Sequence, residues 1–528
     1  MRQSLLLFAF LFSGLVYAQN KVGTDAFYYQ SFDNMKPDSE TTQKEVSTDV
    51  LYNIRTLYQP VYSEGISGQA LDLTENVPFR IPYALEPNEC PSYGENSSFS
   101  IVVWVKTLKG ARQGTPVMTN KKAGEKDSVG WCIGTQDNGA WYWNISDGKT
   151  TYDYEPTAER QVINDGEWHQ IAVSVNRKKQ EMWMYLDGKN VAVYRLETRV
   201  RQGTDSLESV VSHWRTVIGG SDEYAEPDHH NSRREWMAFN GKIDEVKIWT
   251  RPISSSEVLA DYTKYKPSLV TGTTNTPDRL KVQVWNIWHG GHRFGQHVGV
   301  ARTAKILKEE NADIIGLIET YGSGAILADT LGYYFYLLSS NLSILSRYPI
   351  TETIRIYQSF FSGGVLLDLG NNQKLAFFDT WLWYADNGRR LMEIKSILSD
   401  MEPYIKQADN VPVIMVGDFN THSHLDVIGE EEIAKLPVTQ EVLKAGFGDS
   451  YREIHPDPLY SPGFTWTPYY NEQEIAKKGS IKNWLRRIDF IFYKGKNLKL
   501  YNSEKIDHHH LIWPSDHAGV VSYFYLNR

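Results

Sequence analysis

Residues 411–420, VPVIMVGDFN, decide the fold class of the C-terminal half of this sequence. The apolar run from Val411 to Val416 has no polar alternation, which is typical of a strand that is buried on both faces of a sheet. Asp418 and Asn420 follow directly, at the point where the strand passes into a loop. We therefore predict a mixed α/β domain that carries polar side chains at the ends of buried strands.

The same pattern extends on both sides of this stretch. Residues 282–287 and 314–319 have the composition of strands. Apolar residues at helical spacing predict one helix from Val300, Ala304 and Leu307, and a second from Leu391, Ile394, Leu398 and Met401.

The region from about residue 25 to residue 265 has a different pattern. Short alternating runs at 99–106, 166–175 and 181–186 are separated by turn signals such as Asp187-Gly188, which predicts strands and hairpins of a large antiparallel sandwich. Residues 266–278, KPSLVTGTTNTPD, contain two prolines, one glycine and four threonines without an apolar period, and are predicted to link the two domains.

The N-terminus and the charge balance bear on location and partners. Residues 1–18 have one positive charge, an apolar run and small residues near Ala18, so we expect a secretory signal peptide with export to the periplasm or the cell exterior. The apolar run is shorter than the roughly 20 residues of a membrane anchor. The net charge of -9 disfavours tight nonspecific binding to nucleic acid.

Polar residues suited to chemistry follow the predicted strands of the C-terminal half. Each has an ordinary alternative, such as capping a turn or pairing with an arginine, but together they predict a site for a hard cation such as Mg²⁺, because oxygen ligands converge on one end of a sheet. An Asp beside a His also orients the imidazole and favours its charged form. These residues are Asn286, Glu319, Asp418, Asn420, Asp489, Asp516 and His517.

Residues 279–528 resemble the endonuclease/exonuclease/phosphatase superfamily with its DNase I-like four-layer α/β sandwich. The elements that carry the resemblance occur in order: Asn286, Glu319, Ser346-Arg347-Tyr348-Pro349, Gly417-Asp418-Phe419-Asn420, Asp449-Ser450-Tyr451-Arg452, Thr465-Trp466, Arg487-Ile488-Asp489 and Ser515-Asp516-His517. The resemblance implies phosphoester hydrolysis with Mg²⁺ or Mn²⁺.

The resemblance also implies a role for each site residue. Glu319 is the principal metal ligand, with Asn286 and Asp516 in or near the same shell. The remaining roles fall on four residues: Asp418 orients the attacking water, Asn420 holds a phosphate oxygen, and His517, oriented by Asp489, stabilises the pentavalent centre.

One position departs from the family pattern. Where relatives carry a histidine or tyrosine after Thr, this sequence has Trp381, whose indole donates one hydrogen bond but exchanges no proton at useful pH. We hypothesise that a water at the metal, or His289 or His292, replaces the missing acid. Two further candidates for substrate contact each have a structural alternative: Arg389 as a surface arginine at a helix start, and Trp466 as a core residue.

The N-terminal region resembles laminin-G-like, concanavalin A-like jellyroll domains. The motifs are Gly68-Gln69-Ala70-Leu71, Trp104-Val105-Lys106, Glu167-Trp168-His169, Tyr185-Leu186-Asp187-Gly188 and Phe239-Asn240-Gly241-Lys242-Ile243-Asp244-Glu245-Val246. Such domains bind glycans or surface proteins, often with Ca²⁺, for which Asp33 and Asp244 are candidates; the alternative is that they cap turns. Cys90 and Cys132 either form a disulfide or remain free thiols.

These inferences predict a secreted, divalent-metal-dependent phosphoester hydrolase with an attached ligand-binding jellyroll. Residues 280–528 contain 25 Lys and Arg against 28 Asp and Glu, so small or lipid-type phosphoesters are favoured over nucleic acid, although an extracellular nuclease stays an alternative. A second alternative is an adhesin whose phosphoesterase domain has lost activity through Trp381.

Overall fold

The computed structural model describes residues 25–33, 60–75, 82–85, 90–91, 93–111, 114–122, 124–157, 160–200, 203–222, 238–267, 277–466, 485–509 and 512–527. The chain divides into two compact units, one of Met1–Lys189 and Ser206–Val270 and the other of Asn190–Asp205 and Thr271–Arg528. The predicted signal peptide and residues 268–276 of the predicted linker lie outside the described residues.

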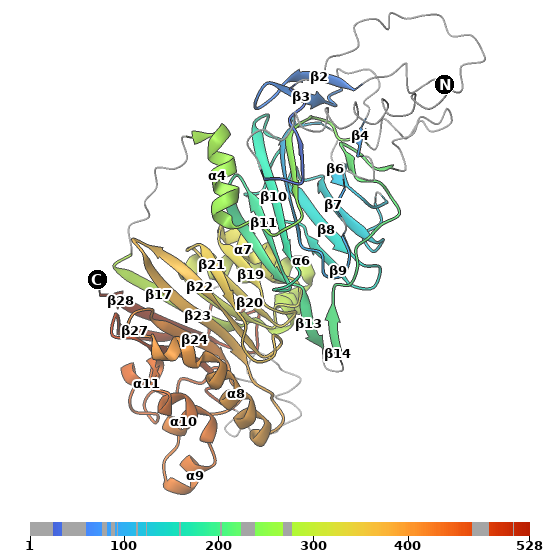
Figure 1. Cartoon of the computed structure of the whole chain (residues 1–528). Helices are drawn as coiled ribbons and strands as arrows, with labels where there is room; N and C mark the ends of the chain where they lie inside the picture. The colour runs from blue at the N-terminus through green and yellow to red at the C-terminus, as the bar shows by residue number, and fades with distance from the viewer. Residues whose placement is uncertain are drawn as a thin grey trace, which may run out of the picture. The chain divides into compact units, whose positions relative to one another are not determined.

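The first unit is a sandwich of two antiparallel sheets, as the sequence predicts (Figure 1). One sheet has the order β2 (Val61–Glu64), β3 (Gln69–Asp72), β16 (Lys242–Trp249), β5 (Phe99–Lys106), β10 (Trp168–Asn176) and β11 (Glu181–Leu186), with β1 (Tyr28–Gln30) paired to β16. The other has the order β4 (Tyr83–Ala84), β15 (Val217–Ile218), β6 (Pro116–Thr119), β7 (Gly130–Thr135), β8 (Trp141–Ser146) and β9 (Thr151–Tyr154). The strands β12 (Lys189–Arg195), β13 (Glu197–Val200) and β14 (Gly203–Ser206) come next in the chain and belong almost wholly to the second unit, where β12 pairs with β19 (Tyr334–Leu337) and β13 pairs with β14.

Large aromatic side chains fill the space between these two sheets. The rings of Phe99 on β5 and Trp131 on β7 lie 6.3 Å apart, and Trp143 Nε1 on β8 donates to Met182 Sδ on β11 at 2.8 Å. Outside the first sheet, helix α4 (Ser255–Tyr265) begins with a capping box at Ser254. Its Tyr262 stacks on Trp104, so this helix covers the outer face of the sheet.

The second unit is built on two further sheets. The first has the order β19 (Tyr334–Leu337), β20 (Leu342–Ser346), β18 (Ile314–Ile318), β17 (Arg279–Asn286), β28 (Gly519–Leu526) and β27 (Leu498–Ile506). The second has the order β21 (Ile350–Ile354), β22 (Ser362–Gly370), β23 (Gln373–Trp381), β24 (Val413–Asp418), β26 (Asp489–Lys494) and β25 (Gly448–Asp449).

Helices cover the outer faces of these sheets. Their bounds are α5 (Trp288–Gly291), α6 (Gln296–Glu310), α7 (Gly324–Leu331), α8 (Asn387–Lys406), α9 (Glu430–Ala434), α10 (Pro437–Lys444) and α11 (Ser450–Ile454), with short 3₁₀ turns η5 (His292–Phe294) and η6 (His424–Asp426). Apolar residues of α8 and α10 pack on β23, β24 and β26 in one core cluster (Figure 1). No helix among the described residues has the length and apolar content needed to cross a bilayer.

The two sheets of the second unit approach closely at Gly316 on β18. A Cβ atom at this position would lie 2.4 Å from Val416 Cγ2 on β24, so only glycine allows the observed spacing. The predicted fold class, a β-sandwich followed by a DNase I-like α/β sandwich, is confirmed. Both predicted helices and the buried strands at β17, β18 and β24 are present.

Candidate active site

Strand pairing brings the predicted polar residues together. Asp418 ends β24 and Asp489 begins β26, and the two residues are direct partners across this antiparallel pair. In the other sheet, Asn286 ends β17 beside Ile318, the last residue of the parallel strand β18, and Glu319 follows at once. Because the two sheets face each other, four polar side chains from distant parts of the chain lie at one edge.

Asn286 connects the acidic residues of the two sheets. Its Nδ2 donates to Glu319 Oε1 and to Asp418 Oδ2, both at 3.2 Å. The backbone N–H of Trp288 donates to Asn286 Oδ1 at 3.0 Å, which fixes the orientation of the amide. Glu319 and Asp418 therefore lie on either side of one buried side chain.

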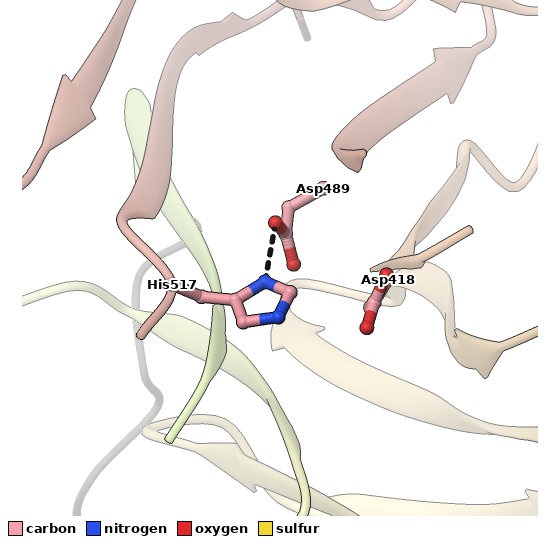
Figure 2. Close-up of side chains that lie close together, drawn as sticks. All are labelled: Asp418, Asp489 and His517. Atoms are coloured by element: carbon pink, nitrogen blue, oxygen red, sulfur yellow. Dashed lines mark hydrogen bonds and ion pairs between the residues drawn. The ribbon is translucent and has the colours of Figure 1, made fainter. Parts of the chain in front are cut away.

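His517 forms the basic part of the site. Its Nδ1 lies 2.9 Å from Asp489 Oδ2, and Figure 2 shows Asp418 on the side of the second ring nitrogen. Although burial disfavours the imidazolium, the charges of Asp489, Asp418 and Asp516 raise the pKa of His517 well above its usual value. The site therefore favours a charged imidazole held by Asp489.

The backbone around His517 is held in place by neighbouring strands and side chains. Ser515 Oγ accepts from the His517 N–H at 3.0 Å and donates to the Asn286 carbonyl at 2.6 Å. The indole N–H groups of Trp285 and Trp513 both donate to the His517 carbonyl, at 3.1 and 2.7 Å. Trp466 forms a backbone bridge with His517.

Asp418 is fixed by the loop that follows it. Asn420 adopts a left-handed backbone with φ of 51°, and its N–H donates to Asp418 Oδ1 at 2.9 Å. The Asn420 amide donates to the Leu382 carbonyl at 3.0 Å and to Asp418 Oδ2 at 3.3 Å. Burial and the charge of Asp489 raise the pKa of Asp418 to about 7.

The site holds more negative than positive charge. Ligand atoms of Asp418, Asp489 and His517 all lie within 4.8 Å of one another, a spacing that could hold a metal ion only with a neutral imidazole, because both nitrogens of a charged imidazole carry protons. Asp489 Oδ1 and Asp516 Oδ1 are buried and have no hydrogen-bond partner in the described part of the chain. Burial, together with the charge of Glu319, raises the pKa of Asp516. A divalent cation would neutralise this excess charge.

The residues predicted to contact substrate lie around this centre. Trp381 is the strand partner of Asp418, but it is mostly buried and packs on Phe361, with 5.8 Å between ring centroids. Arg389 Nε donates to Glu393 at 2.8 Å, and its guanidinium lies over the Trp383 ring. The backbone N–H of His289 donates to Glu319 Oε2 at 3.1 Å.

Two residues that contact this site were not predicted. Asn341 Oδ1 accepts from the Glu319 N–H at 3.2 Å, and Tyr321 lies two residues after Glu319 with an exposed ring. No sequence signal marks them, because Asn341 reaches Glu319 only through the pairing of β18 with β20.

In the first unit, both candidate calcium residues bind backbone N–H groups. Asp244 Oδ2 accepts from Ile66 at 2.9 Å, and Asp33 Oδ1 accepts from Gln69 at 2.9 Å, which supports the turn-capping alternative. Cys90 and Cys132 form no disulfide in the structure, so the disulfide alternative is wrong. Cys132 is buried on β7, where its Sγ lies 3.2 Å from the Tyr142 hydroxyl.

Comparison with known proteins agrees with this geometry. The sequence matches the Endonuclease/Exonuclease/phosphatase family over residues 284–517. This part of the chain is an endonuclease/exonuclease/phosphatase domain. It is preceded over residues 84–259 by a match to the Concanavalin A-like lectin/glucanases superfamily.

Individual relatives cover different parts of the chain. An uncharacterized protein of Caenorhabditis elegans is 26% identical over 292 residues, which are 47% of this chain and 92% of that protein. A non-toxic nonhemagglutinin type D of Clostridium botulinum D phage is 22% identical over 208 residues, 38% of this chain and 14% of that protein.

Two solved structures are similar to about half of the chain. Truncated TDP2 of Caenorhabditis elegans has 19% identity and a TM-score of 0.35, covering 47% of this chain and 98% of its own. An endonuclease/exonuclease/phosphatase of Beutenbergia cavernae has 17% identity and a TM-score of 0.35, covering 48% of this chain and 72% of its own.

Proposed function

We propose that the second unit hydrolyses phosphoester bonds with a divalent cation, Mg²⁺ or Mn²⁺, and that Glu319 holds this ion together with Asn286 and Asp516. The observation that carries the proposal is the excess of buried carboxylates at one edge, where two carboxylate oxygens have no hydrogen-bond partner in the described part of the chain. Hard cations take such oxygen ligands.

The bound cation would neutralise charge on the phosphoryl oxygens, which is the main requirement of phosphoryl transfer. Asp418 orients the attacking water, since its carboxylate is held by Asn286 and Asn420 and lies beside the imidazole. Asn420 holds a phosphate oxygen. His517, kept charged and oriented by Asp489, stabilises the negative charge that develops at phosphorus.

We expect the second unit to be active even though Trp381 stands where relatives carry a histidine or tyrosine. General acid–base catalysis contributes about 10²- to 10⁴-fold, whereas enzymes of this kind lower barriers by on the order of 20 kcal/mol. Positioning and charge neutralisation therefore account for most of the rate. The residues to which we assign positioning and charge neutralisation are hydrogen-bonded at one edge of the two sheets: Asn286 to Glu319 and Asp418, and His517 to Asp489.

The location and substrate belong to the same proposal. We infer export from the N-terminal signal sequence, and binding of a glycan or a surface protein by the jellyroll. The acidic balance of the second unit favours head-group, sugar or lipid phosphoesters over nucleic acid. Export is tested by sequencing the N-terminus of the protein recovered outside the cytoplasm.

The test of activity is a substrate panel with matched variants. The mature protein is incubated with Mg²⁺ or Mn²⁺ and bis-p-nitrophenyl phosphate, p-nitrophenyl phosphate, DNA or phospholipid, with Glu319→Gln and His517→Ala in parallel. We expect hydrolysis of at least one phosphodiester, lost with EDTA and reduced at least about 10²-fold in both variants. If no substrate of the panel is hydrolysed while the protein still binds a glycan, the alternative function, an adhesin without catalytic activity, would be favoured.

A further inference from the structure

Two loops beside Glu319 have an unusual backbone. Trp288 and His289 have φ of 55° and 47°, while Glu319 and Tyr321 have φ of 58° and 37°. Bulky residues rarely adopt this strained left-handed conformation, which persists only where neighbouring structure enforces it. Four such residues at one position in the fold therefore indicate a geometry that the site requires.

Hydrogen bonds hold both loops in this geometry. The Gly290 N–H donates to the Glu319 carbonyl at 2.6 Å, which joins one loop to the other. The Thr320 and Tyr321 N–H groups donate to the carbonyls of Asn341 and Ser340 at 3.1 and 2.9 Å. The segment between β19 and β20 thus fixes the backbone at Tyr321.

The result is a pair of stacked, exposed rings, here called the aromatic rim: His289 and Tyr321. Their centroids lie 5.7 Å apart with 23° between the ring planes. The Tyr321 residue is 42% exposed and the His289 side chain 70% exposed, so neither ring is needed to fill the core.

The aromatic rim is joined directly to the proposed metal ligand. Glu319 Oε2 accepts from the His289 backbone N–H at 3.1 Å and lies 3.9 Å from its Nδ1. Tyr321 is two residues along the chain from Glu319. A phosphoester group at Glu319 therefore has its substituent within reach of a flat ring surface, which favours stacking on another planar ring.

We propose that His289 and Tyr321 form a specificity subsite that stacks on a planar aromatic group attached to the phosphate of the substrate, either a nucleobase or an aryl ester. This inference rests on the proposed function and names its substrate class. The strained loops serve to place the two rings beside the phosphate. Charge balance alone favours small phosphoesters over nucleic acid, and within that class this subsite selects esters that carry an aromatic ring over aliphatic head-group, sugar or lipid esters.

The test measures ligand binding to the full-length protein by calorimetry in Mg²⁺. Phenylphosphonate and methylphosphonate are not hydrolysed and differ only in the ring, and thymidine 5′-phosphate against ribose 5-phosphate supplies the nucleobase arm. We expect the ring-bearing member of at least one pair to bind about tenfold tighter, because stacking on an aromatic side chain is of that order. A difference in affinity within the phosphonate pair would indicate an aryl ester, and a difference within the nucleotide and sugar phosphate pair would indicate a nucleobase.

Variants assign the effect to the rim. Tyr321→Leu is expected to reduce the tenfold preference to less than about threefold, His289→Leu to reduce it as well, and Tyr321→Phe to keep it. Tyr460→Leu is the matched control, since Tyr460 is 91% exposed on another loop of the same unit. Equal affinities within both pairs, or a preference unchanged in Tyr321→Leu, would overturn the aromatic rim.

The two proposals fail in different ways. Metal-dependent hydrolysis with no ring preference would leave the phosphoesterase in place and overturn the subsite. A ring preference that Tyr321→Leu removes, in a protein that hydrolyses nothing in the panel, would support the subsite and overturn the enzyme. Absence of binding by every ligand of both pairs, in a protein that hydrolyses nothing in the panel, would overturn both proposals.

Discussion

Asn286 has an unusual role for an amide, because it joins two carboxylates that would otherwise repel each other. Its single Nδ2 group donates to both Glu319 and Asp418. An isosteric carboxylate at this position would add a further negative charge to the buried edge, where such charge is costly. The residue type therefore follows from the electrostatics of its neighbours.

His169 in the first unit provides a residue-scale prediction about pH. Its Nδ1 lies 2.8 Å from Asp187 Oδ2 and its Nε2 lies 3.0 Å from Asp165 Oδ1. Burial opposes the charged form, but both aspartates favour it, and the pKa of His169 is raised in the folded state. The stabilisation of the folded first unit by charged His169 is therefore fully present below the pKa of this residue in the unfolded chain, about 6.5. It is lost as the pH rises through the higher pKa of His169 in the folded protein.

We expect His169→Gln to lower the free energy of unfolding of the first unit by about 1–3 kcal/mol at pH 5.5, and by clearly less at pH 9. Chemical unfolding followed by tryptophan fluorescence at the two pH values measures the difference. Lys179→Gln, a change on an exposed turn of the same unit, is the control. A loss that grows with pH would contradict the charged pair.

Part of the site was predictable at this scale and part was not. Glu319, Asp418, Asp489 and His517 follow or begin strands, and strand ends are where side chains of distant segments meet. Tyr321 and Asn341 carry no such signal, since their place depends on a left-handed backbone and on the register between β18 and β20. The absence of a bridge between Cys90 and Cys132 likewise could not be predicted from a cysteine count.

At the scale of elements, the site depends on how closely two sheets approach. β18 and β17 carry Glu319 and Asn286, whereas β24 and β26 carry Asp418 and Asp489. The unbroken apolar runs of β18 and β24 predict burial on both faces, which the structure confirms. The spacing itself is set by Gly316, whose role the sequence does not reveal.

Gly316→Ala is expected to force the sheets apart, because the added methyl group would lie 2.4 Å from Val416 Cγ2 and 3.1 Å from the Asp379 carboxyl. Overpacking of this kind costs about 1–3 kcal/mol or more. The substitution should also lower kcat, because it separates Glu319 from Asp418. Calorimetric unfolding and the phosphoester assay measure the two effects.

The matched control for this substitution is Gly388→Ala in α8. A Cβ atom at Gly388 meets no neighbour closer than 3.4 Å, and alanine favours a helix over glycine by about 0.5–1 kcal/mol. We expect unchanged or slightly raised stability. If both alanine variants behaved alike, close approach of the sheets at Gly316 would not be the cause.

At the scale of the whole molecule, the chain combines two units with different chemistry. The first has aromatic residues between two antiparallel sheets, and its candidate calcium carboxylates are occupied by backbone N–H groups. The second concentrates buried carboxylates at one edge. The proposed cation should therefore affect one unit and leave the other unchanged.

Metal removal tests this difference between the units. A ligand that binds only the native state stabilises it by about 2.7 kcal/mol at 100 times its Kd. We expect Mg²⁺ or Mn²⁺ to raise the unfolding temperature of the second unit and EDTA to abolish the increase. In Glu319→Gln, neither the metal ion nor EDTA should change this temperature. Scanning calorimetry, with the transitions assigned by limited proteolysis, measures this. If Mg²⁺ or Mn²⁺ raised the unfolding temperature of Glu319→Gln as much as that of the unchanged protein, the cation would bind at another site. If Ca²⁺ raised the unfolding temperature of the first unit alone, turn capping by Asp33 and Asp244 would be contradicted.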